Sequence, residues 1–219
     1  MRAVDFWVGI PLTFLLTLVY RLQRLVGLAA SPEGAPRKIL FIQLAEMGTM
    51  VVAYPALRKA RELFPDATLH FLCFTEIRSS VEMLEIIPPD NIITIDAHSA
   101  LSFARDTLAF PWRARQRGID TVINMEAFVR YSNILSYLSG ARRRVGFHRF
   151  NQEGLYAGDL QTHKVIYNAH IHTAHTFLDL VHALQMPFDQ VPRVKRPKAA
   201  DNLEVPKITT DANAAAAIW

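Results

Sequence analysis

The chain has 219 residues, of which 51% are hydrophobic and 20% charged, with 24 lysines and arginines against 20 acidic residues. Such a composition excludes a disordered or polyelectrolyte protein, and the length suits one domain, or one domain with a membrane-associated tail. The formal charge of +4 is mild, and no dense basic stripe with interleaved aromatics marks a nucleic-acid binder, so we expect no nucleic-acid partner. The basic excess indicates anionic lipid, phosphate or sugar-phosphate partners instead.

Residues 1–29 form an apolar segment that differs from the rest of the chain. Residues 6–20 carry no charge, and Arg21 and Arg24 interrupt the next apolar run. This stretch is shorter than the roughly 20 residues of a spanning helix, which leaves a cleaved signal peptide, an anchor at the membrane surface, or a core helix. We favour the anchor, because the two arginines stand where a signal peptide is normally uncharged. The flanking basic residues then keep the remainder of the chain cytoplasmic.

After a small, proline-containing linker over residues 30–37, apolar runs of strand length alternate with helical patterns. Residues 38–44 are almost continuously apolar, as in a strand buried on both faces of a parallel sheet. Further strands are expected at residues 68–74, 92–96, 121–125 and 145–147, and helices at residues 49–64, 76–87, 101–117, 128–138 and 172–186. The alternation predicts a Rossmann-like, doubly wound, mostly parallel α/β domain over residues 38–190, followed by a linker over residues 191–219.

The loop over residues 45–48, after the first predicted strand, is where such a sheet would place chemistry. It contains one glycine, not the three of a dinucleotide fingerprint, and no Gly-Lys-Ser/Thr comes after it, so NAD and P-loop chemistry are disfavoured. Glu46 precedes Thr49, which we expect to cap the next helix. The Glu46 carboxylate could take a proton from a substrate hydroxyl, or only cap and solvate the loop, and composition alone favours the second role.

The order of several short motifs carries more information than the composition. The first strand leads into Gly48 and then Pro55-Ala56-Leu57, residues 64–67 read F-P-D-A, and residues 139–147 read S-G-A-R-R-R-x-G-F. In this order, over about residues 38–184, the chain resembles the amino-terminal half of the heptosyltransferases, the glycosyltransferase family 9 enzymes of lipopolysaccharide assembly.

The resemblance implies half of a GT-B fold, in which a first domain receives the acceptor and a second domain, which would follow Trp219, holds the donor. It implies inverting sugar transfer from a nucleoside-diphosphate-sugar, with no further cofactor, to a lipid-linked glycan at the cytoplasmic face of the bacterial inner membrane. We therefore expect this chain to be the acceptor half of such an enzyme. The alternative is a membrane-anchored, non-catalytic module that binds envelope glycolipid or a partner chain.

The catalytic base departs from the family pattern. An aspartate usually follows the loop glycine, but here that position is Thr49, whose hydroxyl cannot act as a general base at neutral pH. The resemblance to a subgroup with a glutamate in this loop and an E-x-F-x-R-x-S stretch, here residues 126–132, makes Glu46 our predicted base and Glu126 the second candidate. Arg130 lies one helical turn from Glu126 and could pair with it.

A basic group is expected to capture acceptor phosphates with forked guanidinium groups, and its members are Arg142, Arg143, Arg144 and Arg149. The plainer alternative is a solvated loop beside a strand. Gly48 would let the acceptor approach the backbone.

His172 matches the position of the family's helix-opening histidine, although it could simply start a helix packed on the sheet. His175, Asp179 and His182 share one predicted helix face, but three ligands from a single helix rarely converge on one ion, so we expect no metal site. The predicted acceptor-binding set is Gly48, Thr49, Glu126, Arg130, Arg142, Arg143, Arg144, Arg149 and His172.

Overall fold

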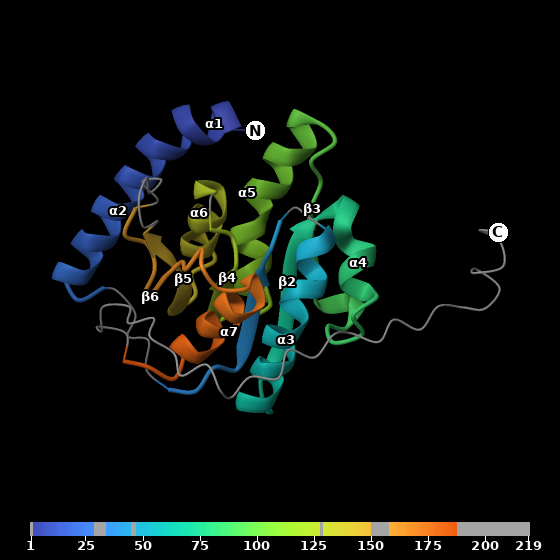
Figure 1. Cartoon of the computed structure of the whole chain (residues 1–219). Coiled ribbons are helices and arrows are strands. Elements are labelled where there is room, and N and C mark those ends of the chain that lie inside the picture. The colour runs from blue at the N-terminus through green and yellow to red at the C-terminus, as the bar shows by residue number, and fades with distance from the viewer. Residues whose placement is uncertain (1, 29–33, 45–46, 128, 150–157, 188–219) are drawn as a thin grey trace.

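The computed structural model describes residues 2–28, 34–44, 47–127, 129–149 and 158–187, and contains one sheet of six parallel strands (Figure 1). The strands are β1 (Lys38–Ile42), β2 (Thr68–Phe74), β3 (Ile92–Ile95), β4 (Thr121–Asn124), β5 (Arg143–Arg149) and β6 (His163–Ile166). Their order across the sheet is β3-β2-β1-β4-β5-β6, so the direction of winding reverses between β1 and β4. This is the doubly wound arrangement that the sequence predicts.

Helices cover both faces of the sheet (Figure 1). On one face lie α3 (Met47–Leu63), the short α4 (Arg78–Glu82) and α7 (Thr173–Ala183), and on the other lie α5 (Ala100–Gln116) and α6 (Arg130–Leu138). Strand β1 supplies both layers, because Ile39 and Phe41 enter the core under α3 while Leu40 and Ile42 enter the core under α5. Burial on both faces is why this strand reads as a continuous apolar run.

Two elements differ from the sequence-based prediction. The helix expected over residues 76–87 is shorter: a 3-10 turn (Thr75–Ile77) leads into α4, which ends at Glu82. Glu85 then adopts a left-handed φ of +54°, which the right-handed helix cannot contain. Strand β6 has no clear signal in the sequence, because its four residues are alternately buried and half-buried and include His163 and Lys164.

The amino-terminal segment forms two helices, α1 (Arg2–Trp7) and α2 (Gly9–Leu25), which lie along the outer side of the domain beside α6 (Figure 1). The side of α2 that faces the domain is small and polar, since its buried residues are Gly9, Thr13 and Thr17. The Thr13 hydroxyl donates to the Gly9 carbonyl at 2.5 Å and the Thr17 hydroxyl to the Thr13 carbonyl at 2.7 Å. These bonds satisfy the two hydroxyls within the helix, so α2 can pack closely on the domain.

Specific contacts fix α2 to the domain. The backbone N–H of Asp159 donates to Thr17 Oγ1 at 3.0 Å, and the Tyr137 hydroxyl of α6 donates to Gln23 Oε1 at 3.0 Å. By length and composition, residues Asp5–Leu25 could cross a membrane, although only 17% of the most apolar part of this segment is buried in the protein. Because the helix is docked but mostly uncovered, the membrane anchor stays a prediction, and a helix enclosed by the core is excluded.

Candidate functional site

The carboxyl ends of all six strands lie along one edge of the sheet, because the strands are parallel. In open α/β sheets ligands bind outside this edge, at the point where the winding reverses. Here that point lies between β1 and β4. The described side chains closest in sequence to it are Gln43 and Leu44 after β1, and Met125 and Glu126 after β4.

Glu126 joins the two segments at this point. Its Oε1 accepts a hydrogen bond from the Leu44 backbone N–H at 2.8 Å and another from Gln43 Nε2 at 3.1 Å. A carboxylate bonded to a backbone N–H fixes the direction in which the chain leaves β1. Glu126 therefore lies on the predicted edge and orients the loop that leads to Glu46. Glu46 itself lies outside the described residues, so its role as the base stays a prediction.

A buried polar network beneath α6 supports Glu126, and it was not predicted from the sequence. Asn124, the last residue of β4, is fully buried and accepts from the Glu126 backbone N–H at 3.2 Å. Its Nδ2 donates to Ser132 Oγ at 3.1 Å and to Asn133 Oδ1 at 3.0 Å. Asn133 Oδ1 also accepts from Gln161 Nε2 at 2.6 Å. Such networks specify a single arrangement, because each buried polar group is costly without its partner. The feature of the sequence that could have indicated this network is an asparagine at the end of a buried strand.

The start of α3 corrects the expectation for Thr49. The helix begins at Met47, so Thr49 lies inside the first turn and is not the capping residue. Gly48 is exposed, and a methyl group in its place would meet open space. Packing among the described residues therefore does not require glycine at this position, and its part in the approach of an acceptor stays a prediction.

Arg130 does not stand free to receive an acceptor. Its Nη1 forms an ion pair with Asp5 Oδ2 of α1 at 3.0 Å, and its side chain is 5% exposed. Asp5 Oδ1 accepts from the backbone N–H groups of Arg130 and Tyr131, at 3.0 and 3.1 Å. Asp5 thus acts as the cap of α6, since the residue before this helix provides no side-chain cap. Arg130 is thus engaged within the domain by Asp5, and its predicted acceptor-binding role gains no support from this geometry.

The structure gives no support to the prediction that Arg143 and Arg144 capture acceptor phosphates, which stays untested. Both begin β5 at the opposite, amino-terminal edge of the sheet, and both are buried. Arg143 Nη1 lies 3.7 Å from Asp120 Oδ1, and Arg143 Nη2 donates to the Gly34 carbonyl, which ties the linker to the sheet.

Arg144 lies at the contact between α2 and α6. Its guanidinium carbon is 4.8 Å from the ring centre of Tyr20 and 5.5 Å from that of Tyr137. Its Nε donates to the Leu160 carbonyl at 2.7 Å, and its Nη1 donates to the Ala141 carbonyl at 2.6 Å. Burial lowers the pKa of Arg144, and the two tyrosines oppose that shift. The group therefore acts as a structural cation.

The remaining members of the predicted set are dispersed. Arg142 is exposed, but it precedes β5 at the amino-terminal edge. Arg149 ends β5 at the carboxyl edge, and its side chain lies outside the described residues. His172 is exposed after β6 and caps α7, because its Nδ1 accepts from the Ala174 backbone N–H at 3.2 Å. Arg149 and His172 thus share the carboxyl edge, whereas Arg142 does not.

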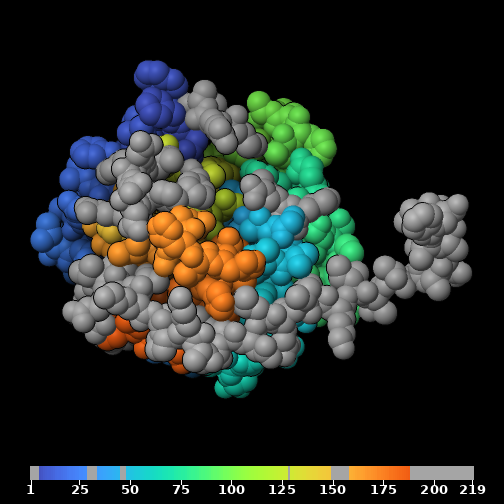
Figure 2. Space-filling view, in the orientation of Figure 1, coloured from blue at the N-terminus to red at the C-terminus, as the bar shows by residue number. Residues whose placement is uncertain are grey.

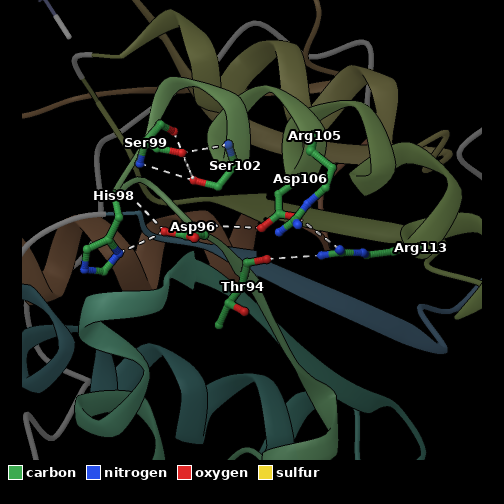
Figure 3. A network of polar contacts seen from close by, with 8 residues as sticks. All are labelled: Thr94, Asp96, His98, Ser99, Ser102, Arg105, Asp106 and Arg113. Atoms are coloured by element: carbon green, nitrogen blue, oxygen red, sulfur yellow. Dashed lines mark hydrogen bonds and ion pairs between the residues drawn. The ribbon is translucent and has the colours of Figure 1, made fainter.

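A second polar group at the carboxyl edge, after β2 and β3, was not predicted (Figure 3). His98 Nδ1 lies 2.9 Å from Asp96 Oδ1 and 3.4 Å from Glu76 Oε1. These two carboxylates raise the pKa of His98, with the hydrogen bond to Asp96 as the main cause. Hydrogen bonds from the His98 backbone and ring lower the pKa of Asp96 in turn.

The loop that carries Asp96 is anchored by Asp106 of α5, as Figure 3 shows. Asp106 Oδ2 accepts from the Asp96 backbone N–H at 3.0 Å, and its Oδ1 lies 3.1 Å from Arg105 Nε and 3.3 Å from Arg113 Nη2. The hydrogen bond from Asp96 is the main cause that lowers the pKa of Asp106. The same loop ends in a reciprocal cap, in which the Ser99 and Ser102 side chains each bond to the other's backbone.

Potential metal ligands approach one another in the described part of the chain only at Glu76, Asp96 and His98, whose ligand atoms lie within 4.8 Å of one another. The imidazole contacts both carboxylates, so a protonated His98 ring offsets one of their two negative charges. His175, Asp179 and His182 on α7 form no such group among the described residues.

Several solved structures share this fold. E. coli ADP-heptose LPS heptosyltransferase II superposes with a TM-score of 0.60 at 13% identity, over 80% of this chain and 47% of that one. The E. coli heptosyltransferase WaaC with ADP-2-deoxy-2-fluoro heptose gives a TM-score of 0.55 at 17% identity, over 70% of this chain and 50% of that one. A family 9 glycosyl transferase from Veillonella parvula superposes with a TM-score of 0.53 at 16% identity, over 68% of this chain and 41% of that one.

The chain therefore spans about half the length of the structures that it matches. No protein-family model matches it, and no curated protein sequence matches it. At these identities the likeness shows the fold, and it confirms the predicted Rossmann-like α/β class.

We predict that His98 titrates above its ordinary pKa of about 6.5. The protonated imidazole stabilises the loop below that ordinary value, and the contribution is lost as the pH rises through the raised pKa. The lowered pKa of Asp96 gives a contribution that is lost as the pH falls through that lowered value. Both contributions are complete between the ordinary pKa of aspartate, about 3.9, and that of histidine, about 6.5, so the pair should be most stabilising in that range. An NMR titration of the His98 ring measures the first directly.

The test variant is Asp96→Asn, which should lower the pKa of His98. The matched control is Asp90→Asn, which removes an exposed carboxylate before β3, at the opposite end of that strand, and should leave the pKa of His98 unchanged. An unchanged His98 titration in Asp96→Asn would contradict the prediction.

We also predict that Asp5→Asn lowers the free energy of unfolding by about 2–3 kcal/mol, because it removes the charge beside the buried Arg130 guanidinium and weakens the cap of α6. The matched control is Glu62→Gln, which removes the acid of an exposed i,i+3 pair with Lys59 at 2.9 Å and should cost less than about 1 kcal/mol. Chemical denaturation followed by circular dichroism compares the two variants. Equal losses would show that Asp5 contributes no more than a surface charge.

Proposed function

We propose that the chain is the acceptor-binding part of a glycosyltransferase of the heptosyltransferase type. The observation that carries the proposal is the carboxylate of Glu126 at the reversal of winding, which accepts a hydrogen bond from the Leu44 backbone N–H at 2.8 Å and so fixes the end of the described segment after β1. The likeness of the fold to heptosyltransferases supports this assignment. The donor would be a nucleoside-diphosphate-sugar, since solved relatives of this fold hold ADP or an ADP-sugar analogue. The acceptor would be a lipopolysaccharide or another lipid-linked envelope glycan.

The reaction that we propose is a direct displacement with inversion. The acceptor hydroxyl oxygen bonds to the anomeric carbon while the bond from that carbon to the diphosphate oxygen breaks, and the nucleoside diphosphate leaves with the electron pair. The proton of the hydroxyl passes to a carboxylate, for which Glu46 is our candidate. Since Glu126 Oε1 already accepts two hydrogen bonds, we assign Glu126 to positioning the loop and not to proton transfer. The scheme uses no metal ion and no cofactor besides the donor.

The second candidate is a non-catalytic module that binds an envelope glycolipid or a partner chain. It is favoured by one observation: Thr49, in the first turn of α3, stands where the resembling family has its catalytic aspartate. The two candidate functions differ in one respect: the enzyme needs Glu46 for sugar transfer, whereas the binding module catalyses nothing.

For the enzyme, Glu46→Gln should abolish sugar transfer while leaving acceptor affinity within about twofold, because the amide retains the size of the side chain but cannot take a proton. Transfer is measured with the complete gene product and radiolabelled donors, and binding by calorimetry of this chain with a lipopolysaccharide-core acceptor.

Glu126→Gln is the matched carboxylate-to-amide change, made at the residue that follows β4. It should lower stability and acceptor affinity together, because Leu44 loses its charged acceptor. Full transfer by Glu46→Gln would remove Glu46 from the mechanism, and no transfer by the unmodified protein with any donor would favour the binding module.

Gly48→Ala separates packing from acceptor approach. Alanine is favoured over glycine inside a helix by roughly 1 kcal/mol and meets open space here, so the free energy of unfolding should rise slightly. If the acceptor lies against this backbone, its affinity should fall by about tenfold or more despite the gain in stability. Thermal unfolding and acceptor calorimetry on the same sample measure both quantities. Unchanged affinity would place the acceptor elsewhere along the edge.

A further inference from the structure

Helix α2 and the end of α1 present their large apolar side chains outward. The inward side carries Gly9, Thr13 and Thr17, whereas the outward side carries Trp7, Phe14, Leu15, Leu18, Leu22 and Leu25, all exposed. Trp7 is 75% exposed, Leu18 59% and Leu25 84%. We call these six residues the apolar helix face. A water-soluble amphipathic helix packs its apolar side inward, so this orientation is reversed. A continuous apolar patch of this kind indicates an interaction surface.

The way in which α1 and α2 are fixed argues against a crossing helix. Asp5, near one end, caps α6 and pairs with Arg130, while Thr17 and Gln23, further along, bond to the Asp159 backbone and to Tyr137. A helix that left the domain to cross a bilayer would break all of these contacts. It would also leave the Arg130 guanidinium without its aspartate.

The charges on this segment select the kind of surface that it meets. Asp5 is the only acidic residue among residues 2–28, and it is turned toward Arg130. Arg21 and Arg24 are exposed near the carboxyl-terminal end of α2, and Arg21 also reaches Asp159 at 3.3 Å. An apolar face without acids, with a tryptophan near one end and arginines near the other, matches helices that lie at the surface of anionic bilayers.

We propose that the apolar helix face docks in the plane of an anionic phospholipid bilayer and holds the domain there as a monotopic membrane protein. A helix of this length offers a strip about 30 Å long, buried about 5–10 Å into the headgroup and acyl boundary. The occupant is the cytoplasmic leaflet, whose anionic lipids attract the arginines. This inference goes beyond the proposed function and does not depend on it.

The attachment would also orient the carboxyl edge of the sheet. Asp5 caps α6, and α6 follows β4 and Glu126 directly in the chain, so the start of the apolar helix face lies at the same edge as Glu126. Figures 1 and 2 show α1 and α2 along one flank of the molecule. For a lipid-linked acceptor, as the proposed function has it, this arrangement would bring the site close to the membrane surface.

The test is flotation of the full chain with vesicles of phosphatidylcholine, with and without phosphatidylglycerol, in the absence of donor and acceptor. The chain should float with the anionic vesicles, and the double variant Leu18→Glu/Leu22→Glu should bind about tenfold or more weakly. The matched control is Met83→Glu, which is 53% exposed and directly follows α4, a helix that packs against β2 on the other side of β1 from β6. It should bind as the unmodified chain does. Unchanged thermal unfolding of all variants shows that the fold is kept.

The depth of the helix distinguishes docking in the plane from crossing. Single cysteines at Trp7, Leu15 and Leu22 can carry a fluorescent label, because the native Cys73 is buried and burial raises the pKa of its thiol to about 12. Quenching by brominated lipids should report similar, shallow depths at all three positions. A label at residue 15 much deeper than those at residues 7 and 22 would overturn the proposal in favour of a crossing helix.

Two further outcomes would also overturn it. The first is the absence of flotation with anionic vesicles. The second is a dimer in sedimentation experiments without lipid that the double variant converts to a monomer, since that would assign the apolar helix face to a second copy of the chain. Since neither sugar donor nor acceptor is present, these results do not depend on whether the chain takes part in glycosyl transfer.

Discussion

The hydrogen bond from the Leu44 backbone to the Glu126 carboxylate determines how the candidate site is built. It connects the ends of β1 and β4, the two strands between which the winding of the sheet reverses. A charged acceptor at this position fixes the first residues of the loop after β1, and Asn124 fixes Glu126 from below. The described start of this loop, Gln43 and Leu44, is therefore held in one position relative to β4.

The arginines of the structure show how much context decides the role of a charge. A guanidinium group removed from water needs partners for its charge and its donors, and Arg130, Arg143 and Arg144 obtain them from different parts of the chain. Arg130 receives Asp5, Arg143 receives Asp120 and a linker carbonyl, and Arg144 receives two carbonyls and two tyrosine rings. All three connect the domain to segments that precede β1 or flank the sheet. Of the four arginines in the predicted phosphate-capturing group, Arg143 and Arg144 therefore serve assembly of the domain.

The two sides of α2 have different environments: one side packs on the domain and the other is exposed. The small and polar side is used for docking, because glycine and threonine allow close approach and the threonine hydroxyls are satisfied within the helix. The large apolar side is left outside. The helix is thus part of the domain although its large hydrophobic residues are not part of the core. Those residues can therefore contact a lipid bilayer, as we propose.

The sequence by itself determined the first five strands, the parallel sheet and the burial of β1 on both faces, because these follow from the period and length of apolar runs, whereas β6 has no such run. It also determined that Glu126 ends a strand on the carboxyl edge. Only the tertiary structure decided that Asp5 caps α6 and that Arg144 lies against Tyr20, since the partners in each of these contacts are separated by more than 100 positions in the chain. Local patterns encode which residues are apolar, but the partner of a charge is fixed by the packing of distant segments.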